Sequence, residues 1–253
     1  MVERARVLER SENYSLRIGI DLDETTFSIF NPVVEYLKSW YLTTFTEADI
    51  INYLWLIEFL KQLGCSQEVT NEEVDLIFGP DDRLRVYQDA PSLPNAVLVL
   101  NQLHDAGHEL FVLTSRPFGT LGVTNSLLSA CGLGWLAGDV AEGGRILMMD
   151  QGYQNKFSGD GDAFKLSVIK GDLEDGKYVG FSGLDFHLDD RASLWSHPLA
   201  RGIQERLIFL TLGYRQRLIP DNVSIDDQMV ANWLSFGEYI SGRKLFLNCV
   251  AQS

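Results

Sequence analysis

Four apolar runs in the chain have the length and composition of buried β-strands. They lie at 16–21 (LRIGID), 108–115 (HELFVLTS), 184–190 (LDFHLDD) and 206–213 (RLIFLTLG). Runs with so little polar alternation are typical of strands that are covered on both faces in a parallel sheet. The first run is apolar up to an acidic cluster, as expected of a strand buried in a parallel sheet, so we expect it to lie at the centre of the sheet.

Segments with helical spacing of apolar residues separate these runs. In the clearest one, 94–107, Val97, Leu100 and Leu103 form an apolar stripe and Gly107 ends the helix. Further helices are predicted around 122–131, 162–170 and 226–241. Strands that alternate with helices favour an α/β fold with a doubly wound parallel sheet.

The stretch 30–88 differs from the rest of the chain. It contains FNPVVEYLKSWY, DIINYLWLIEFLKQLG and NEEVDLIFG, which read as helices, and no clear strand. An all-helical insertion after the first strand would lie over the carboxyl ends of the strands, where such sheets bind ligands. We therefore expect 1–29 and 89–253 to form an α/β core domain and 30–88 a helical cap. The SGDGD segment at 158–162 is the best candidate for a mobile loop.

Composition and charge narrow the class of protein. The 253 residues are 45% hydrophobic, so the chain can bury a sizeable core. With 21 basic and 35 acidic residues the formal net charge is −14, so we expect neither a nucleic acid polymer nor an anionic membrane as partner. Residues 1–15 lack an export signal, and 51–60 is too short and polar to span a membrane. With three scattered cysteines, Cys65, Cys131 and Cys249, these features predict a cytoplasmic protein with reduced thiols.

Two aspartates stand where the first predicted strand ends, in IGIDLDET. Asp21 and Asp23 are alternate residues, so an extended chain would point both carboxylates into one crevice, with Thr25 next in the series. Carboxylates this close repel each other. A magnesium ion, which prefers oxygen ligands, would neutralise them, and a substrate phosphate would complete its shell. A solvated acidic turn is the alternative at this point.

The ends of two other predicted strands are polar in a complementary way. Thr114, Ser115 and Arg116 offer hydroxyl donors and a cation that could hold phosphoryl oxygens. Asp189 and Asp190 form a second acidic pair that could complete a metal shell from across the crevice. Each piece taken alone is also explained by an ordinary turn.

Three lysines precede the strand at 184–190 and could offset the charge of a nucleophilic aspartate and its phosphate. They are Lys156, Lys165 and Lys170. We favour Lys165, because DAFKLSVIK reads as an aspartate-capped first helical turn that could aim it at the site. Lys156 is the reserve choice.

The order of these motifs, DxDxT, Thr-Ser, a lysine and DD, resembles that of the haloacid dehalogenase superfamily of phosphohydrolases. The resemblance runs from about residue 16 to residue 191, and DLDET is its most specific part. It implies that Asp21 is a nucleophile that forms a phosphoaspartate. Asp23 would protonate the leaving oxygen and then activate water.

The same resemblance implies the remaining roles. Thr114 and Lys165 would hold the phosphoryl group, and the neighbouring Thr25, Ser115 and Arg116 are assigned to substrate binding. Magnesium would be held by Asp21, the backbone carbonyl of Asp23 and Asp189, with Asp190 in support. The interval from Lys165 to Asp189 is longer than usual in this superfamily.

A narrower likeness links YQDAPSLPNAVLVLNQLHDAGHELFVLTSRP to the 5′-nucleotidase branch, especially the deoxyribonucleotidases, and the helical insertion to the first cap type of the superfamily. It suggests a nucleoside monophosphate as substrate, with Phe27, Phe30, Trp40 or Trp55 stacking on the base. Glu24 stands where relatives carry a small residue, so its charge would lie beside the phosphate.

Other classes of protein fit less well. A phosphorelay receiver has its acidic pair first and its lysine last, and would leave about half of the chain unexplained. A dinucleotide-binding enzyme needs a glycine-rich loop after the first strand, which is absent. Two alternatives stay open: a phosphatase for a sugar phosphate or other small metabolite, and a protein that binds a phosphorylated ligand without turnover. His187 is predicted to be packed rather than catalytic.

Overall fold

A six-stranded parallel sheet forms the centre of the protein. The computed structural model describes residues 15–41, 46, 53–79, 81–211 and 229–250. Within them the strand order is β3-β2-β1-β4-β5-β6, and every neighbouring pair is parallel. The strands are β1 (Arg17–Ile20), β2 (Glu109–Thr114), β3 (Ile146–Met148), β4 (Phe186–Asp189), β5 (Leu207–Leu210) and β6 (Met229–Val230). β1 is interior, between β2 and β4, as its apolar run predicts.

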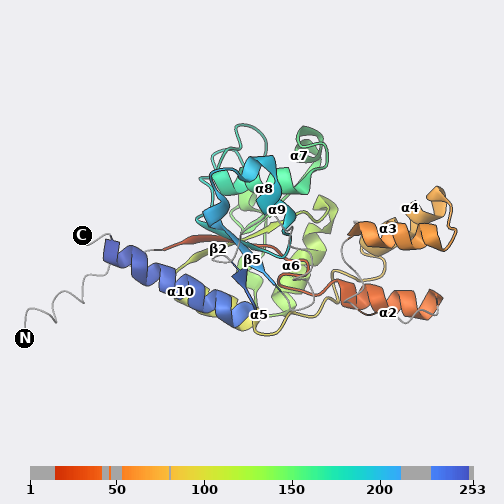
Figure 1. Ribbon diagram of the computed structural model, residues 1–253, viewed down its shortest axis with the longest axis horizontal. Helices are drawn as coiled ribbons and strands as arrows, with labels where there is room; N and C mark the ends of the chain where they lie inside the picture. Colours follow the sequence, from red (N-terminus) through yellow and green to blue (C-terminus); the bar gives the residue numbers. More distant parts are fainter. Residues whose placement is uncertain (1–14, 42–45, 47–52, 80, 212–228, 251–253) are drawn as a thin grey trace, which may run out of the picture.

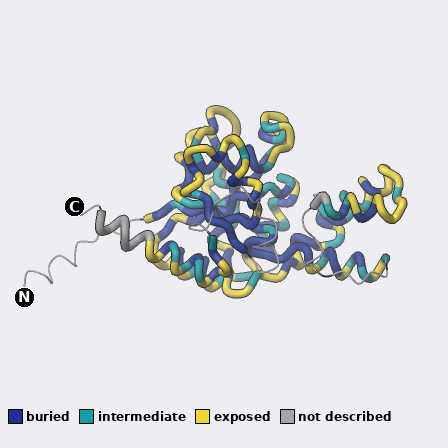
Figure 2. Tube along the Cα trace, in the orientation of Figure 1, coloured by how far each residue is buried: buried dark blue, intermediate teal, exposed yellow. Residues whose placement is uncertain are grey.

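Helices cover both faces of this sheet (Figure 1). The core on one face contains side chains of α5 (Ala96–Asp105), α6 (Leu121–Ala130) and α10 (Trp233–Val250). The core on the other contains side chains of α7 (Gln151–Lys156), α8 (Gly161–Lys170) and α9 (Ser193–Ser196). In β2, Leu110 and Val112 belong to the first core, and Phe111 and Leu113 to the second. The predicted doubly wound α/β fold is confirmed, and Figure 2 shows the strands buried between the two layers.

Three helices occupy the stretch between β1 and α5, to one side of the sheet (Figure 1). They are α2 (Phe30–Tyr41), α3 (Tyr53–Gln62) and α4 (Gln67–Phe78). No strand occurs among the described residues of this stretch, so the all-helical insertion after the first strand is confirmed. The division into a core of 1–29 and 89–253 and a cap of 30–88 stays a prediction. Within the predicted helix at 49–64 the structure describes α3, Tyr53–Gln62, and 49–52 lie outside the described residues.

Short 3₁₀ turns connect the larger elements, at Phe118–Thr120, Gly134–Leu136, Val140–Glu142, Pro198–Ala200 and Gln204–Arg206. No helix in the described part of the chain combines the length and the hydropathy needed to cross a lipid bilayer.

Two strands were missing from the sequence prediction. β3 is only three residues long, too short to give a recognisable pattern. β6 falls inside 226–241, which was predicted as helix; that prediction is wrong at Met229–Val230, and the helix begins at Trp233. β6 forms because it pairs with β5, and the local sequence of 226–241 carries no signal of that pairing. Positions 212–213 and 226–228 lie outside the described residues.

The segment predicted as a mobile loop, 158–162, leads directly into α8. Asp160 caps this helix by accepting backbone N–H donors of Asp162 and Ala163, and Gly161 is its first residue. The prediction that an aspartate caps this helix is therefore confirmed, but the capping residue is Asp160 rather than Asp162.

Candidate active site at the carboxyl end of the sheet

Asp21 directly follows β1 and is 3% exposed. Its backbone N–H donates to the carbonyl of Leu188 in β4, at 3.0 Å, so the chain is still held as part of the sheet. Its carboxylate Oδ1 lies 2.7 Å from Lys165 Nζ. Burial raises the pKa of Asp21 to about 7, although Lys165 opposes the rise. The ammonium alone is therefore insufficient to stabilise the ionised form fully.

Lys165 projects from α8 and is fully buried. Its Nζ lies 2.7 Å from Asp21 Oδ1 and 2.7 Å from Asp189 Oδ2. Burial alone would lower the pKa of Lys165, but the two carboxylates outweigh burial and raise it. Of the three lysines considered from sequence, this is the one at the aspartates. Lys156 instead pairs with Asp175 on the surface.

Asp189 ends β4 and accepts hydrogen bonds on both carboxylate oxygens. Oδ2 receives Lys165 and lies 3.0 Å from His187 Nε2, and Oδ1 accepts the backbone N–H of Arg191 at 2.9 Å. Burial opposes its ionisation, but Lys165 and the hydrogen bond from His187 hold the pKa of Asp189 well below its usual range. Burial lowers the pKa of His187, which favours the neutral ring. Asp189 is thus an anion that fixes Lys165 in place.

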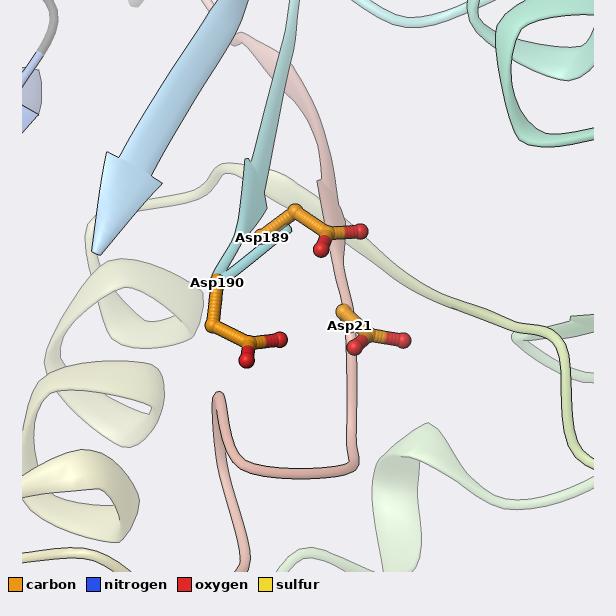
Figure 3. A group of neighbouring side chains, drawn as sticks. All are labelled: Asp21, Asp189 and Asp190. Atoms are coloured by element: carbon orange, nitrogen blue, oxygen red, sulfur yellow. The ribbon is translucent and has the colours of Figure 1, made fainter. Parts of the chain in front are cut away.

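Asp190 brings a third carboxylate to the same place (Figure 3). Oxygens of Asp21, Asp189 and Asp190 lie within 4.8 Å of one another, and all three residues are buried. Thr25 holds Asp190: its hydroxyl accepts the Asp190 N–H at 3.1 Å and lies 3.3 Å from Oδ1. Residues far apart in the sequence therefore converge at the carboxyl ends of β1 and β4.

The loop after β1 is fixed by several hydrogen bonds. Thr26 Oγ1 donates to the carbonyl of Asp21 at 2.8 Å, and Trp233 Nε1 in α10 donates to the carbonyl of Thr25 at 2.8 Å. The carboxylates are consequently held by a tight turn rather than by a solvated acidic loop.

Asp23 is a quarter exposed and forms an ion pair with Arg116. Nε and Nη2 of Arg116 donate to Asp23 Oδ1 at 2.8 and 2.5 Å. The third nitrogen, Nη1, donates to Thr124 Oγ1 at 3.1 Å, and the guanidinium lies over the ring of Tyr87 with its carbon 4.5 Å from the ring centroid. Arg116 was expected among the substrate-binding residues, but all of these contacts are within the protein.

Thr114 is the last residue of β2, which lies beside β1, and Ser115 follows it. Thr114 is 1% exposed, and its hydroxyl oxygen accepts the N–H of Arg116 at 3.3 Å, which leaves the hydroxyl hydrogen available for donation. Ser115 is half-buried and contacts the first turn of α8, because a Cβ at Gly161 would meet Ser115 Cβ at 2.9 Å. The end of β2 and the helix that carries Lys165 are thus packed together.

The side chain of Glu24 hydrogen-bonds to the start of the helical insertion. Its backbone is left-handed, with φ +57°, and its Oε1 accepts the N–H of Phe30 at 2.8 Å and lies 3.4 Å from Ser28 Oγ. The carboxylate therefore satisfies a donor at the start of α2, where the helix dipole also favours negative charge. Glu24 thus holds the first helix of the insertion, and the effect of its charge on a bound phosphate stays a prediction.

The four aromatic residues proposed to stack on a base have different environments. Phe27 and Phe30 belong to the hydrophobic core. Trp55 stacks on Phe59 with ring centroids 5.3 Å apart, whereas Trp40 is 72% exposed. Phe27 and Phe30 are thus core residues, and their stacking on a ligand is not supported.

Two features of this site were not predicted as part of it. His187 was expected only to pack; it is buried and also contacts Asp189, its alternate neighbour in β4. Alternate strand residues share a face, so the spacing carried that signal. Gly19 makes space for the ring, since a Cβ there would lie 2.9 Å from His187 Nδ1. Tyr87 under Arg116 had no signal in the local pattern.

Solved structures with this fold include hydrolases. The chain is similar to a hydrolase from Pseudomonas syringae, with 13% identity, TM-score 0.51 and coverage of 90% of this chain and 99% of that one. It is also similar to a protein named as a haloacid dehalogenase-like hydrolase from Burkholderia xenovorans LB400, with 14% identity, TM-score 0.52 and coverage of 92% and 99%. No family model matches the sequence, and neither does any curated protein. The chain therefore shares its overall fold with these two hydrolases.

Proposed function

We propose that this protein is a magnesium-dependent phosphomonoester hydrolase that acts through a phosphoaspartate on Asp21. The observation that carries the proposal is the position of Asp21, which contacts Lys165 and shares a buried cluster with Asp189 and Asp190. A carboxylate attacks a phosphate dianion only when the repulsion between them is offset, and a lysine and a metal ion would do this. The shared fold of haloacid dehalogenase-like hydrolases supports the same class of reaction.

The donor set fits a magnesium ion. It consists of carboxylate oxygens of three neighbouring aspartates, which Mg²⁺ prefers, and a buried ammonium contacts two of the three. Asp21 and Asp190 would hold the ion, with the backbone carbonyl of Asp23. Asp189 remains within reach, but its oxygens already accept three hydrogen bonds, which suits it better to placing Lys165. When bound, the ion would screen negative charge on the phosphate and on Asp21.

In the first step a carboxylate oxygen of Asp21 attacks phosphorus, and the bond from phosphorus to the ester oxygen breaks. Asp23, in its carboxylic acid form, gives its proton to that oxygen, so the product leaves as an alcohol and Asp23 becomes a carboxylate. In the second step Asp23 takes a proton from water, whose oxygen attacks phosphorus and releases Asp21 and inorganic phosphate. Thr114 and Lys165 would donate hydrogen bonds to the phosphoryl oxygens, with Ser115 and Thr25 close by.

The substrate we propose is a nucleoside or deoxynucleoside monophosphate. Support comes from the resemblance of the segment before and through β2 to the 5′-nucleotidase branch, and from the all-helical insertion that would contact the leaving group. A phosphate-release assay across nucleoside monophosphates and sugar phosphates, with magnesium or with EDTA, tests both levels of the proposal. Release from sugar phosphates alone would remove the nucleotidase assignment, and no release from any ester would remove the hydrolase.

Asp21→Asn tests the covalent mechanism. The substitution keeps the volume and removes the nucleophilic charge, so we expect turnover to fall by at least about a thousandfold with the fold retained. Trapping with a radiolabelled phosphoryl donor should label the wild type and not the variant. Retention of full activity by Asp21→Asn would eliminate the phosphoaspartate.

A further inference from the structure

The guanidinium of Arg116 is buried at the edge of the candidate site. Its side chain is 0% exposed, whereas that of Asp23 is 24% exposed. Each of its three nitrogens donates to a protein group: Nε and Nη2 to Asp23 Oδ1, and Nη1 to Thr124 Oγ1. A side chain committed in this way is poorly placed to bind phosphate, but it can set the direction of a carboxylate that reaches solvent.

The guanidinium also contacts an aromatic ring. Arg116 lies over the ring of Tyr87, at 4.5 Å, and the hydroxyl of Tyr87 donates to the carbonyl of Phe78, the last residue of α4, at 3.1 Å. The guanidinium of Arg116 thus packs on Tyr87, which lies in the segment between α4 and α5 that links the helical insertion to the core. Planar stacking and bidentate donation are properties that lysine lacks.

We propose that Arg116 is a positioning residue for Asp23 rather than a substrate-binding residue: it holds Oδ1 of Asp23 so that the carboxyl group, in its protonated form, is oriented for proton transfer to the leaving oxygen. This inference rests on the proposed hydrolase function for the chemical role of Asp23. The pairing itself stands on the geometry alone.

The dependence on the leaving group separates positioning from phosphate binding. An alkyl ester needs a proton on its leaving oxygen, whereas p-nitrophenolate leaves well without one. In Arg116→Lys we expect kcat/KM for an alkyl phosphate to fall at least about tenfold more than that for p-nitrophenyl phosphate, because kcat/KM reports the step up to bond cleavage. The p-nitrophenolate burst measures this step even where hydrolysis of the phosphoaspartate is slow.

A double-mutant cycle with Asp23→Asn identifies the group through which Arg116 acts. If it acts through Asp23, Arg116→Lys causes no further change in the ratio between the two esters in the Asp23→Asn background. Equal loss for both esters, or a loss that persists in that background, would mean that the guanidinium acts on the phosphate and would overturn the proposal. Arg145→Lys is the matched control, since it makes the same change near the opposite end of β2.

Crystal structures without substrate test the position independently of turnover. We expect Asp23 in one orientation in the wild type and in a different one, or in several, in Arg116→Met. If that variant does not fold, Tyr87→Leu removes the supporting ring while keeping every charge. An unchanged Asp23 in the folded variant would overturn the proposal even if the wild type hydrolysed no ester, whereas an inactive wild type with a displaced Asp23 in the variant would count against the hydrolase function alone.

Discussion

Asp21 shows how burial and chemistry are linked at the scale of one residue. Its carboxylate is desolvated and lies beside Asp189 and Asp23, yet one lysine reaches it. The ionised form that a nucleophile needs is therefore the form that the folded protein stabilises least, until positive charge is added. A bound divalent cation would offset the free energy needed to ionise the buried carboxyl group of Asp21.

The raised pKa of Asp21 predicts a particular pH dependence of stability. The pKa of Asp21 is about 7 in the folded protein and 3.8 in an unfolded chain. Burial of the protonated carboxyl group therefore contributes fully to the free energy of unfolding below pH 3.8, and this contribution is lost as the pH rises through 7. Asp189 has the opposite sign, because its pKa is lowered. In EDTA, the free energy of unfolding of the wild type relative to Asp21→Asn should decrease by about 2–4 kcal/mol from about pH 4.5 to about pH 8.

Urea denaturation at several pH values measures this difference. Subtraction of the Asp21→Asn curve removes the contributions of groups that both proteins share. A difference that does not vary with pH would contradict the raised pKa. Saturating magnesium should flatten it, because the ion stabilises the carboxylate form.

Glu24 gives a second prediction at this scale. Because its Oε1 accepts the N–H of Phe30, Glu24→Ala leaves that buried donor without this partner and should lower the free energy of unfolding by about 1–2 kcal/mol. Glu24→Gln keeps an acceptor oxygen at the same position and should cost less. Chemical denaturation of the three proteins measures both effects. A larger effect of Glu24→Gln than of Glu24→Ala would contradict the capping role.

At the scale of elements, α8 connects the parts of the site. Asp160 caps it, Gly161 lets it approach Ser115, and Lys165 extends from it between two carboxylates. The position of the lysine therefore depends on how closely the first turn of the helix packs against the end of β2.

Gly161→Ala tests this packing. Alanine favours a helix, but its Cβ would lie 2.9 Å from Ser115 Cβ, so we expect a destabilisation of about 1–3 kcal/mol and reduced turnover. Gly122→Ala in α6 is the matched control: a Cβ there meets nothing within 4 Å, and stability should rise by up to about 1 kcal/mol. Thermal unfolding and phosphate release compare the two. If Gly161→Ala were as stable and active as Gly122→Ala, the close contact would have no consequence.

At the scale of the whole molecule, charge and metal binding act together. The net charge of −14 includes a buried carboxylate cluster that salt cannot screen well. Magnesium at about 100 times its Kd should add about 2.7 kcal/mol to the free energy of unfolding, which corresponds to a rise in Tm of roughly 5–10 °C. Sodium chloride at equal ionic strength is the control.

Asp190→Asn should remove most of that magnesium-dependent rise while leaving the effect of sodium chloride unchanged. Differential scanning calorimetry with both salts measures it. An equal magnesium effect in wild type and Asp190→Asn would exclude Asp190 from the ion's ligands.

The sequence by itself determined the class of fold and the edge at which the polar residues gather. Buried parallel strands need continuous apolar runs, so 16–21, 108–115 and 184–190 were recognisable, and the acids and hydroxyls at their ends had to meet because parallel strands end on one side. β3 and β6 were missed because short strands are defined by their pairing partners.

Only the tertiary structure decided which partner each polar group took. Lys165 rather than Lys156 reaches the aspartates, Arg116 pairs with Asp23, and Glu24 turns towards the start of α2. These outcomes depend on distances between segments far apart in the chain and on the direction of long, flexible side chains. A local pattern specifies where such a residue is attached to the backbone, but packing specifies where its charged end lies.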